Sequence, residues 1–334
     1  MMASLEQLVC RYTGATSATQ VATVQSLWSG YGEIVRMYLA GLPISNAIVK
    51  RVVPPPLKSK NQVRATAAAQ SHARKLKSYA VEAVWYRKYS NRCDDSCRVP
   101  QLLGLHEDSE GWLFVLEDLD AAGFGARPAQ ASSDHVKSVL GWLAAFHATF
   151  LHVAPVGLWK VGTYWHLATR AHELGQMQNQ VLRALAPKID ARLNGCQFRT
   201  LVHGDAKLEN FCFSPDPDKA GTPKSRVSAV DFQYVGAGCG IKDVVYFMSS
   251  VWSAAECKAG EADALAFYFS RLRTELELRQ LGCEAVAVEQ EWRALYPYAW
   301  ADFQRFLEGW ARGQYDGDPY AAEQVERIRA NEGN

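Results

Sequence analysis

Two carboxylates and one amide are spaced along the sequence in a way that suits phosphoryl-transfer chemistry. Asp205 and Asn210 lie in the segment LVHGDAKLENFCF, which spans residues 201–213, and Asp231 follows in VDFQ. Phosphoryl transfer needs a carboxylate that orients the attacking hydroxyl and at least two oxygen ligands that hold Mg²⁺ against the phosphates. We therefore expect Asp205 to face a substrate hydroxyl, and Asn210 and Asp231 to bind the metal ion.

His203 and Asp205 admit a different chemistry, as ligands of a hydrolytic metal site. Such a site would need further His or Asp residues at close spacing, and the neighbouring sequence offers none. We expect His203 to support its loop rather than to move protons, and His147 to be a core histidine.

At these residues the sequence resembles the kinase-like phosphotransferase superfamily, in particular its aminoglycoside phosphotransferase, choline kinase and ecdysteroid-kinase-like branch. His203-Gly204-Asp205 followed by Asn210 resembles the catalytic loop of that branch, and Asp231 stands where its metal-binding aspartate is found. Protein kinases usually have Arg where this chain has Gly204. The resemblance therefore implies an ATP- and Mg²⁺-dependent kinase that phosphorylates a small molecule on a hydroxyl group.

The resemblance extends to residues on both sides of this segment. Lys50 in AIVK resembles the strand lysine that pairs with the ATP phosphates, and Glu82 would be its helix partner. Lys207 is similar to the lysine that neutralises the transferring phosphate in serine/threonine protein kinases, although a lysine in an exposed loop is otherwise a solvated charge. The segment from Glu117 to Leu119 resembles the hinge whose backbone groups would meet the adenine. Asp243 falls where the family often has an acidic residue that supports the catalytic loop.

A short glycine turn near the N-terminus is a second candidate for phosphate binding. Gly30 and Gly32, within residues 29–32, could let backbone amides approach the phosphates because glycine permits a close turn. The full G-x-G-x-x-G pattern is missing, since Val35 occupies the third glycine position. An ordinary hairpin turn therefore stays open as the alternative.

The N-terminal residues of this set need a small sheet and one helix to position them. Residues 21–28 and 33–40 flank the glycine turn and favour a hairpin, and residues 47–53 predict a third strand that ends at three prolines. Residues 113–119 predict a further strand. Between about residues 71 and 90 the apolar positions recur at helical spacing, which predicts a helix with one face on the sheet.

Beyond residue 120 the pattern becomes mainly helical. A helix with an apolar face from Val136 to Leu151 could be capped by Ser132, Ser133 or Asp134. Residues 211–213 and 227–232 predict two short strands joined by an exposed hairpin loop, and helices rich in Trp and Tyr follow from about residue 242. The chain is thus expected to have an α+β, two-lobed, protein-kinase-like fold, with a nucleotide-binding lobe at 1–117 and a mainly α-helical catalytic and substrate lobe at 118–334.

The acceptor is not specified by any motif. The C-terminal helices carry aromatic residues that could line an acceptor pocket and would suit a cationic, choline-like ligand, although aromatic stripes at helical spacing are often core. A polycationic aminoglycoside would need an acidic pocket, for which the composition offers no acidic stripe. Choline-like amines, sugars and lipophilic alcohols stay open. The aromatic set is Trp252, Trp292, Tyr296, Tyr298, Trp300 and Trp310.

Composition indicates which classes of partner are unexpected and in which cellular compartment the protein is expected. Lys plus Arg number 36 and Asp plus Glu number 35, so the overall field favours neither nucleic acid nor an anionic membrane. The first twenty residues lack a signal-peptide pattern and no segment resembles a membrane span, so a cytosolic address is expected. Cys93 and Cys97 are the only close cysteine pair among eight, and free thiols are a simpler interpretation than zinc binding.

A catalytically silent nucleotide-binding or scaffolding protein of the same fold is the alternative function. A silent relative would be expected to lack at least one of the four central residues, and this chain has Lys50, Asp205, Asn210 and Asp231. We therefore expect an enzyme, a phosphotransferase with an alcohol group as acceptor.

Overall fold

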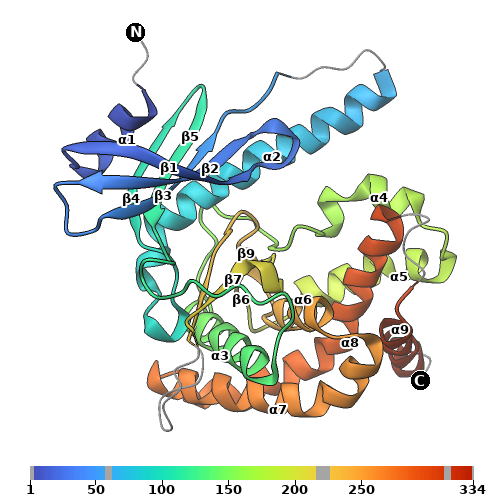
Figure 1. Ribbon diagram of the computed structural model, residues 1–334. Coiled ribbons are helices and arrows are strands. Elements are labelled where there is room, and N and C mark those ends of the chain that lie inside the picture. The colour runs from blue at the N-terminus through green and yellow to red at the C-terminus, as the bar shows by residue number, and fades with distance from the viewer. Residues whose placement is uncertain (1–3, 57–61, 216–225, 312–316, 333–334) are drawn as a thin grey trace.

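The computed structural model describes residues 4–56, 62–215, 226–311 and 317–332. A small lobe with one sheet lies above a larger, mainly helical lobe (Figure 1). The predicted α+β, two-lobed, protein-kinase-like architecture is confirmed.

The small lobe is built on a five-stranded antiparallel sheet with strand order β1-β2-β3-β5-β4. The glycine turn joins the first two strands, as predicted, and the three prolines follow the third. The fourth strand was not predicted; it carries Gly104 and two acidic residues, and its side chains are half-buried or exposed without alternation. The strands are β1 Ser17–Ser26, β2 Gly32–Ala40, β3 Asn46–Val52, β4 Leu102–Asp108 and β5 Gly111–Glu117.

Each face of this sheet is covered by a helix. Because side chains alternate along a strand, Val49 and Val115 pack with Val9 of α1 (Leu5–Thr13), whereas Phe114 packs on the opposite face near Tyr86 of α2. The helix expected at about residues 71–90 is present as α2 (Gln62–Lys88) and begins earlier than predicted. Helix α1 was not predicted; its Ser4 capping box fixes its start.

The large lobe packs helices around two short antiparallel pairs of strands, β6 with β9 and β7 with β8. Helix α3 begins after Ser132, whose hydroxyl accepts the His135 amide, so the first of the three expected caps is the one used. The helices are α3 Ser133–Thr149, α4 Ala171–Gln176, α5 Gln180–Asn194, α6 Ile241–Val251, α7 Ala254–Leu278, α8 Ala285–Trp310 and α9 Pro319–Glu332. The strands are β6 Thr200–Val202, β7 Phe211–Phe213, β8 Val227–Ala229 and β9 Gly236–Gly238.

An aromatic cluster joins the two lobes. Trp85 of α2 stacks on Phe232 of the large lobe with ring centroids 4.3 Å apart, and Phe146 of α3 lies 5.7 Å from Trp85. All three side chains are fully buried. Offset and tilted aromatic pairs of this kind add about 0.5–1.5 kcal/mol each beyond their buried area, so the cluster holds α2 in a defined place over the large lobe.

One prediction about the large lobe needs correction. The strand expected at residues 227–232 ends at Ala229, because Asp231 adopts a left-handed backbone conformation with φ of 67°. Of the aromatic residues for which an acceptor pocket and core packing were both open, Trp292, Tyr296, Tyr298 and Trp300 are buried in the core. Most of the loop expected between β7 and β8 lies outside the described residues.

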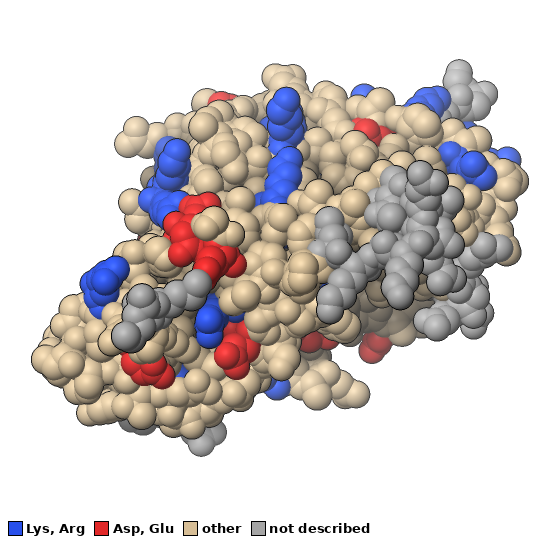
Figure 2. All heavy atoms as spheres, turned by 90° about the horizontal axis from the view of Figure 1, so that it is seen from above, with Lys and Arg blue, Asp and Glu red and all other residues tan. Residues whose placement is uncertain are grey.

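The charged side chains are mixed over the face shown in Figure 2, and the cysteines form no disulfide. On the face seen in Figure 2, basic and acidic side chains are interspersed among a larger uncharged surface. None of the helices within the described ranges is both long and apolar enough to cross a membrane. All eight cysteines are free thiols, Cys93 and Cys97 included.

Candidate functional site

The loop of residues 203–210 brings Asp205 and Asn210 together directly after β6. The Asn210 side-chain amide donates hydrogen bonds to the Asp205 backbone carbonyl at 2.7 Å and to its carboxylate Oδ2 at 3.1 Å. The other carboxylate oxygen, Oδ1, accepts the Tyr246 hydroxyl at 3.2 Å. Both oxygens of Asp205 are therefore held in a fixed orientation before any substrate arrives.

The environment of Asp205 suits a proton acceptor near neutral pH. Burial raises the pKa of Asp205 to about 7, and the negative charge of Asp231 acts in the same direction. Lys207 and the hydrogen bonds from Asn210 and Tyr246 oppose this rise. A general base works best when its pKa lies close to the working pH.

Helix α6 holds the 203–210 loop with three side chains on one face. Asp243 accepts the backbone amides of His203 at 2.6 Å and Gly204 at 2.9 Å. Tyr246, one turn later, binds Asp205, and the Ser250 hydroxyl accepts the Leu208 amide at 3.2 Å. The spacing i, i+3, i+7 places all three on the same side of a helix. Asp243 supports the loop as expected, and it is one of three α6 residues that do so.

The geometry of His203 does not suit a metal ligand. Its Nε2 bonds the Val230 carbonyl at 2.9 Å, and its Nδ1 accepts the Asp205 amide at 3.2 Å. Burial lowers the pKa of His203, so the ring is neutral and both nitrogens are occupied. His147 is a buried core residue between Tyr268 and Asp243. Within the described ranges, no three His, Cys, Asp or Glu side chains gather as a metal site.

Lys50 and Glu82 form a buried ion pair at the floor of the small lobe. Lys50 Nζ lies 2.7 Å from Glu82 Oε2 and 3.9 Å from Asp231 Oδ1. Burial by itself lowers the pKa of Lys50, but the carboxylates of Glu82 and Asp231 outweigh it and raise the pKa. Lys50 therefore keeps its charge and reaches across from β3 to the large lobe.

Asp231 is fixed by a small hydrogen-bond chain that connects the lobes. Gln233 donates to Asp231 Oδ1 at 2.7 Å, and its own side-chain oxygen accepts the Ser78 hydroxyl of α2 at 3.1 Å. The left-handed backbone at Asp231 turns the chain out of β8 and toward Lys50. Sequence reasoning missed Ser78, Gln233 and Tyr246, because each acts through a partner that is distant in sequence.

The side-chain oxygens of Asn210 and Asp231 are suitable ligands for a divalent cation. Among the described residues, no hydrogen-bond donor contacts Asn210 Oδ1 or Asp231 Oδ2. Amide and carboxylate oxygens are the ligands that Mg²⁺ prefers, and this ion usually takes one or two protein ligands together with phosphate oxygens. Asn210 and Asp231 can hold such an ion.

The remaining predicted residues lie around this centre in different settings. The Lys207 ammonium makes no ion pair within the described part of the chain and is half-buried near Asp205. A Cβ at Gly32, where φ is 130°, would lie 2.0 Å from the Arg51 carbonyl oxygen, so this glycine is required by the packing of the hairpin against β3. Gly30 has open space around it.

The segment after β5 presents its backbone rather than its side chains. The Glu117 carboxylate binds Arg98 at 2.6 Å, and Asp118 binds Arg36 at 2.6 Å. The Leu119 carbonyl accepts the Phe124 amide, while the Leu119 amide has no acceptor among the described residues.

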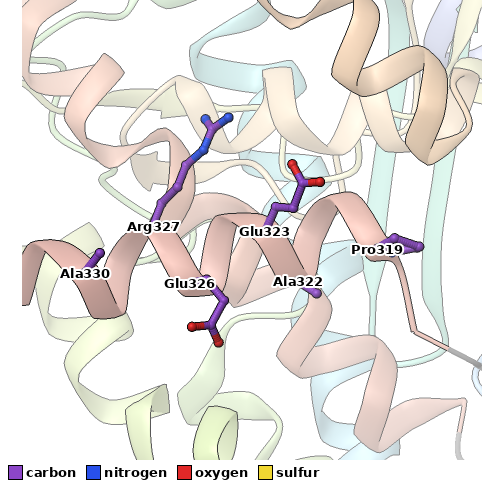
Figure 3. Close-up of a pocket in the computed structure, with 6 residues that line it drawn as sticks. All are labelled: Pro319, Ala322, Glu323, Glu326, Arg327 and Ala330. Atoms are coloured by element: carbon purple, nitrogen blue, oxygen red, sulfur yellow. The ribbon is translucent and has the colours of Figure 1, made fainter.

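Two hollows lie outside this centre. One is shallow and is lined only by residues of α9, among which Glu323 and Arg327 project to one side of the helix and Glu326 to the other (Figure 3). It shares no residue with the site. The second lies between α2 and the start of α4.

Comparisons with known proteins give a family match over part of the chain and a similar fold. Residues 161–281, which include Asp205, Asn210 and Asp231, match the ecdysteroid kinase-like family. An amicoumacin kinase in complex with AMP-PNP and Ca²⁺ is 13% identical, with a TM-score of 0.52 over 94% of this chain and 86% of that one. No curated protein sequence matches the chain significantly.

Two further solved structures have lower TM-scores. A microcompartment-associated aminopropanol kinase is 14% identical, with a TM-score of 0.48 over 93% of this chain and 89% of that one. A choline kinase from Streptococcus pneumoniae is 13% identical, with a TM-score of 0.44 over 93% and 92%. The chain shares the fold of the amicoumacin kinase, and its segment 161–281 matches the ecdysteroid kinase-like family.

Proposed function

We propose that this protein is an ATP- and Mg²⁺-dependent kinase that transfers the γ-phosphoryl group to a hydroxyl group of a small molecule. The observation that carries the proposal is the carboxylate of Asp205, held on both oxygens and next to Asn210, with Lys50 and Asp231 nearby. The match of residues 161–281 to a family of kinase-like proteins supports it.

In the proposed reaction, Asp205 orients the acceptor hydroxyl and takes its proton. A bond forms between the hydroxyl oxygen and the γ-phosphorus, the bond from the γ-phosphorus to the bridging oxygen of the β-phosphate breaks, and ADP leaves. Because such a transition state is loose, the proton moves late, and catalysis rests mainly on positioning and electrostatics. A carboxylate with a pKa of about 7 suits this task.

The cationic side chains would bind the nucleotide phosphates. Lys50, held by Glu82, would contact phosphate oxygens, and the ammonium of Lys207 would face the transferring group. Asn210 and Asp231 would hold Mg²⁺, which neutralises phosphate charge when bound. The Leu119 amide and the Glu117 backbone would meet the adenine, and the turn at Gly30 would lie near the phosphates. The complex of the amicoumacin kinase with AMP-PNP and Ca²⁺ is in keeping with nucleotide and metal binding.

We also propose the division into lobes at 1–117 and 118–334, because β5 ends at Glu117. A cytosolic address is part of the same proposal, supported by eight free cysteines.

Acceptor-dependent release of ADP tests the proposal. The protein is incubated with ATP and Mg²⁺ and a panel of amino alcohols, sugars, hydroxy acids and lipophilic alcohols, and mass spectrometry identifies the phosphorylated product. We expect at least one acceptor to stimulate ADP release, with loss of the signal when EDTA removes the metal. ATP binding without turnover on every acceptor would instead favour the catalytically silent protein.

A further inference from the structure

The glycine turn of residues 29–32 lies beside α2, and two α2 side chains hold it there (Figure 1). Lys75 Nζ donates to the Ser29 hydroxyl at 2.9 Å and lies 4.5 Å from the centre of the Tyr31 ring. Three residues earlier on α2, His72 Nδ1 forms a hydrogen bond with the Tyr31 hydroxyl. The turn is therefore attached to the helix through the side chains of both Ser29 and Tyr31.

The backbone of Ser29 adopts a conformation that serine rarely takes. Its φ is 60° and its ψ is 27°, in the left-handed region that favours glycine. Such a residue persists only where its surroundings hold it, and the hydrogen bond from Lys75 is the one that its side chain makes among the described residues. Burial and the positive charge of Arg74 lower the pKa of Lys75, as expected for an ammonium that is partly withdrawn from water. Lys75 thus stabilises Ser29 in this conformation.

The turn has a backbone geometry that suits an anion. Ser29 and Gly30 have positive φ values of 60° and 73°, and Tyr31 follows with φ of −78° and ψ of 3°. A change of hand between successive residues can point neighbouring N–H groups into one concavity, which suits phosphate oxygens. The shape of the turn therefore depends on the residue that holds Ser29.

The turn lies close to Lys50 on the α2 side of the sheet. Lys50 on β3 pairs in register with Ile34, two residues after Gly32 on β2. At about 3.3 Å per residue along a strand, the end of the turn lies on the order of 10 Å from Lys50. The ring of Tyr79 on α2 lies beside both, with its centre 6.1 Å from the centre of the Tyr31 ring and 5.5 Å from Lys50 Nζ. The turn and Lys50 can therefore meet the same chain of phosphates.

One face of α2 connects this turn to the residues proposed to bind phosphate and metal. Glu82, seven residues after Lys75, pairs with Lys50 at 2.7 Å. Ser78, between them, is linked to Asp231 by hydrogen bonds through one glutamine side chain. The spacing i, i+3, i+7 places the three α2 side chains on one side of the helix. A single helix thus sets the position of the turn relative to Lys50 and Asp231.

We propose that Lys75 is a positioning residue of the nucleotide site, which holds Ser29 in its left-handed conformation so that the turn can receive the ATP phosphates. Lys75 acts through Ser29 and the Tyr31 ring and does not touch the nucleotide. The inference rests on the nucleotide-binding part of the proposed function, and it needs neither an acceptor nor turnover.

Nucleotide binding by Lys75→Met tests the proposal, since methionine keeps a long side chain and removes the ammonium. We expect the Kd for AMP-PNP with Mg²⁺, measured by titration calorimetry, to rise about 5- to 20-fold, and the Kd for adenosine to stay within about twofold. Adenosine has no phosphate, so an equal loss for both ligands would indicate a general disturbance of the lobe and overturn the proposal. An unchanged Kd for AMP-PNP would overturn it too.

Lys88→Met is the matched control for the loss of a charge from this helix. Lys88 is the last residue of α2 and is exposed. The control should leave both dissociation constants within about twofold of wild type. A loss in Lys88→Met as large as in Lys75→Met would show that the effect comes from the charge of the helix and not from the contact with the turn.

A rescue experiment distinguishes positioning from direct contact with phosphate. Because glycine adopts left-handed φ values without strain, Ser29→Gly added to Lys75→Met should restore the Kd for AMP-PNP to within about threefold of wild type. Ser29→Ala loses the hydroxyl and keeps the strain, so it should weaken AMP-PNP about as much as Lys75→Met does. Failure of Ser29→Gly to restore affinity would mean that the Lys75 ammonium contacts phosphate itself, which overturns the positioning role.

Binding and turnover together separate this inference from the kinase proposal. If AMP-PNP binds to wild type but no alcohol stimulates ADP release, the kinase proposal fails, and the effect of Lys75→Met on binding still decides the role of Lys75. If an alcohol stimulates ADP release and Lys75→Met binds AMP-PNP like wild type, only the inference fails. Wild type that binds no AMP-PNP overturns both.

Discussion

At the scale of single residues, the site is defined by what holds Asp205. The sequence indicated Asp205, Asn210 and Asp231 because their types and spacing suit phosphoryl transfer. It gave no sign of Tyr246, whose hydroxyl binds Asp205 from a helix about forty residues later. A tyrosine in an apolar helix resembles any core tyrosine, so only the tertiary structure reveals this hydrogen bond.

Tyr246→Phe should move the pH dependence of turnover. The Tyr246 hydrogen bond lowers the pKa of Asp205, so its loss should raise that pKa, and the base must be deprotonated to act. We expect the acidic limb of kcat/KM to shift upward by up to about one pH unit. Ser249→Ala, on the same helix, is the control and should leave the profile unchanged. An unshifted limb in Tyr246→Phe would mean that this contact does not tune the base.

Gly204 is a second residue whose requirement is structural. Its φ is 81°, and a Cβ there would lie 2.3 Å from the Tyr234 carbonyl oxygen. We expect Gly204→Ala to lower the free energy of unfolding by about 2 kcal/mol or more. Gly123→Ala has a similar φ of 87° with open space around it, so it should cost only about 1 kcal/mol. Urea unfolding of both variants measures the difference, and equal losses would show that the close approach to Tyr234 is unimportant.

At the scale of elements, the sequence predicted the strands that are apolar runs bounded by turn residues and the helices with a regular apolar spacing. The first hairpin and β3 were found because apolar runs flank a glycine turn or end at three prolines, β5 was found as a further apolar run, and α3 was found because its apolar residues repeat at helical spacing. Strand β4 was missed because its burial does not alternate, and β8 was drawn too long because the left-handed turn at Asp231 leaves no mark in an apolar sequence. The contact of α6 with the 203–210 loop likewise depends on tertiary packing.

Asp243 tests whether α6 determines the position of that loop. Its buried carboxylate accepts the amides of His203 and Gly204 and contacts His147. Asp243→Ala would leave these buried donors unpaired, so we expect a loss of about 3–5 kcal/mol in the free energy of unfolding. Asp243→Asn keeps one oxygen acceptor and should lose less. Chemical denaturation at unchanged m-value measures both, and an Ala variant as stable as wild type would refute this role.

At the scale of the whole molecule, the candidate site lies between two lobes that aromatic side chains hold together. The sequence was sufficient for the two-lobed fold, since the small sheet, its helix and the helical remainder follow the order of the motifs. It could not reveal the cavity between α2 and α4, where Arg74 of one lobe and Arg170 of the other lie on facing walls although they are about a hundred residues apart. Neither arginine belongs to a motif, and their proximity exists only in the folded chain.

The central claim is that Asp205 is the catalytic base of a phosphoryl transfer, and turnover of Asp205→Asn tests it most directly. With an acceptor that stimulates ADP release by wild type, at saturating ATP and Mg²⁺, we expect kcat to fall by about 10²- to 10⁴-fold. ATP affinity, measured by calorimetry, should stay within about threefold of wild type, because the carboxylate acts on the acceptor. A variant that keeps near-normal kcat would contradict the account.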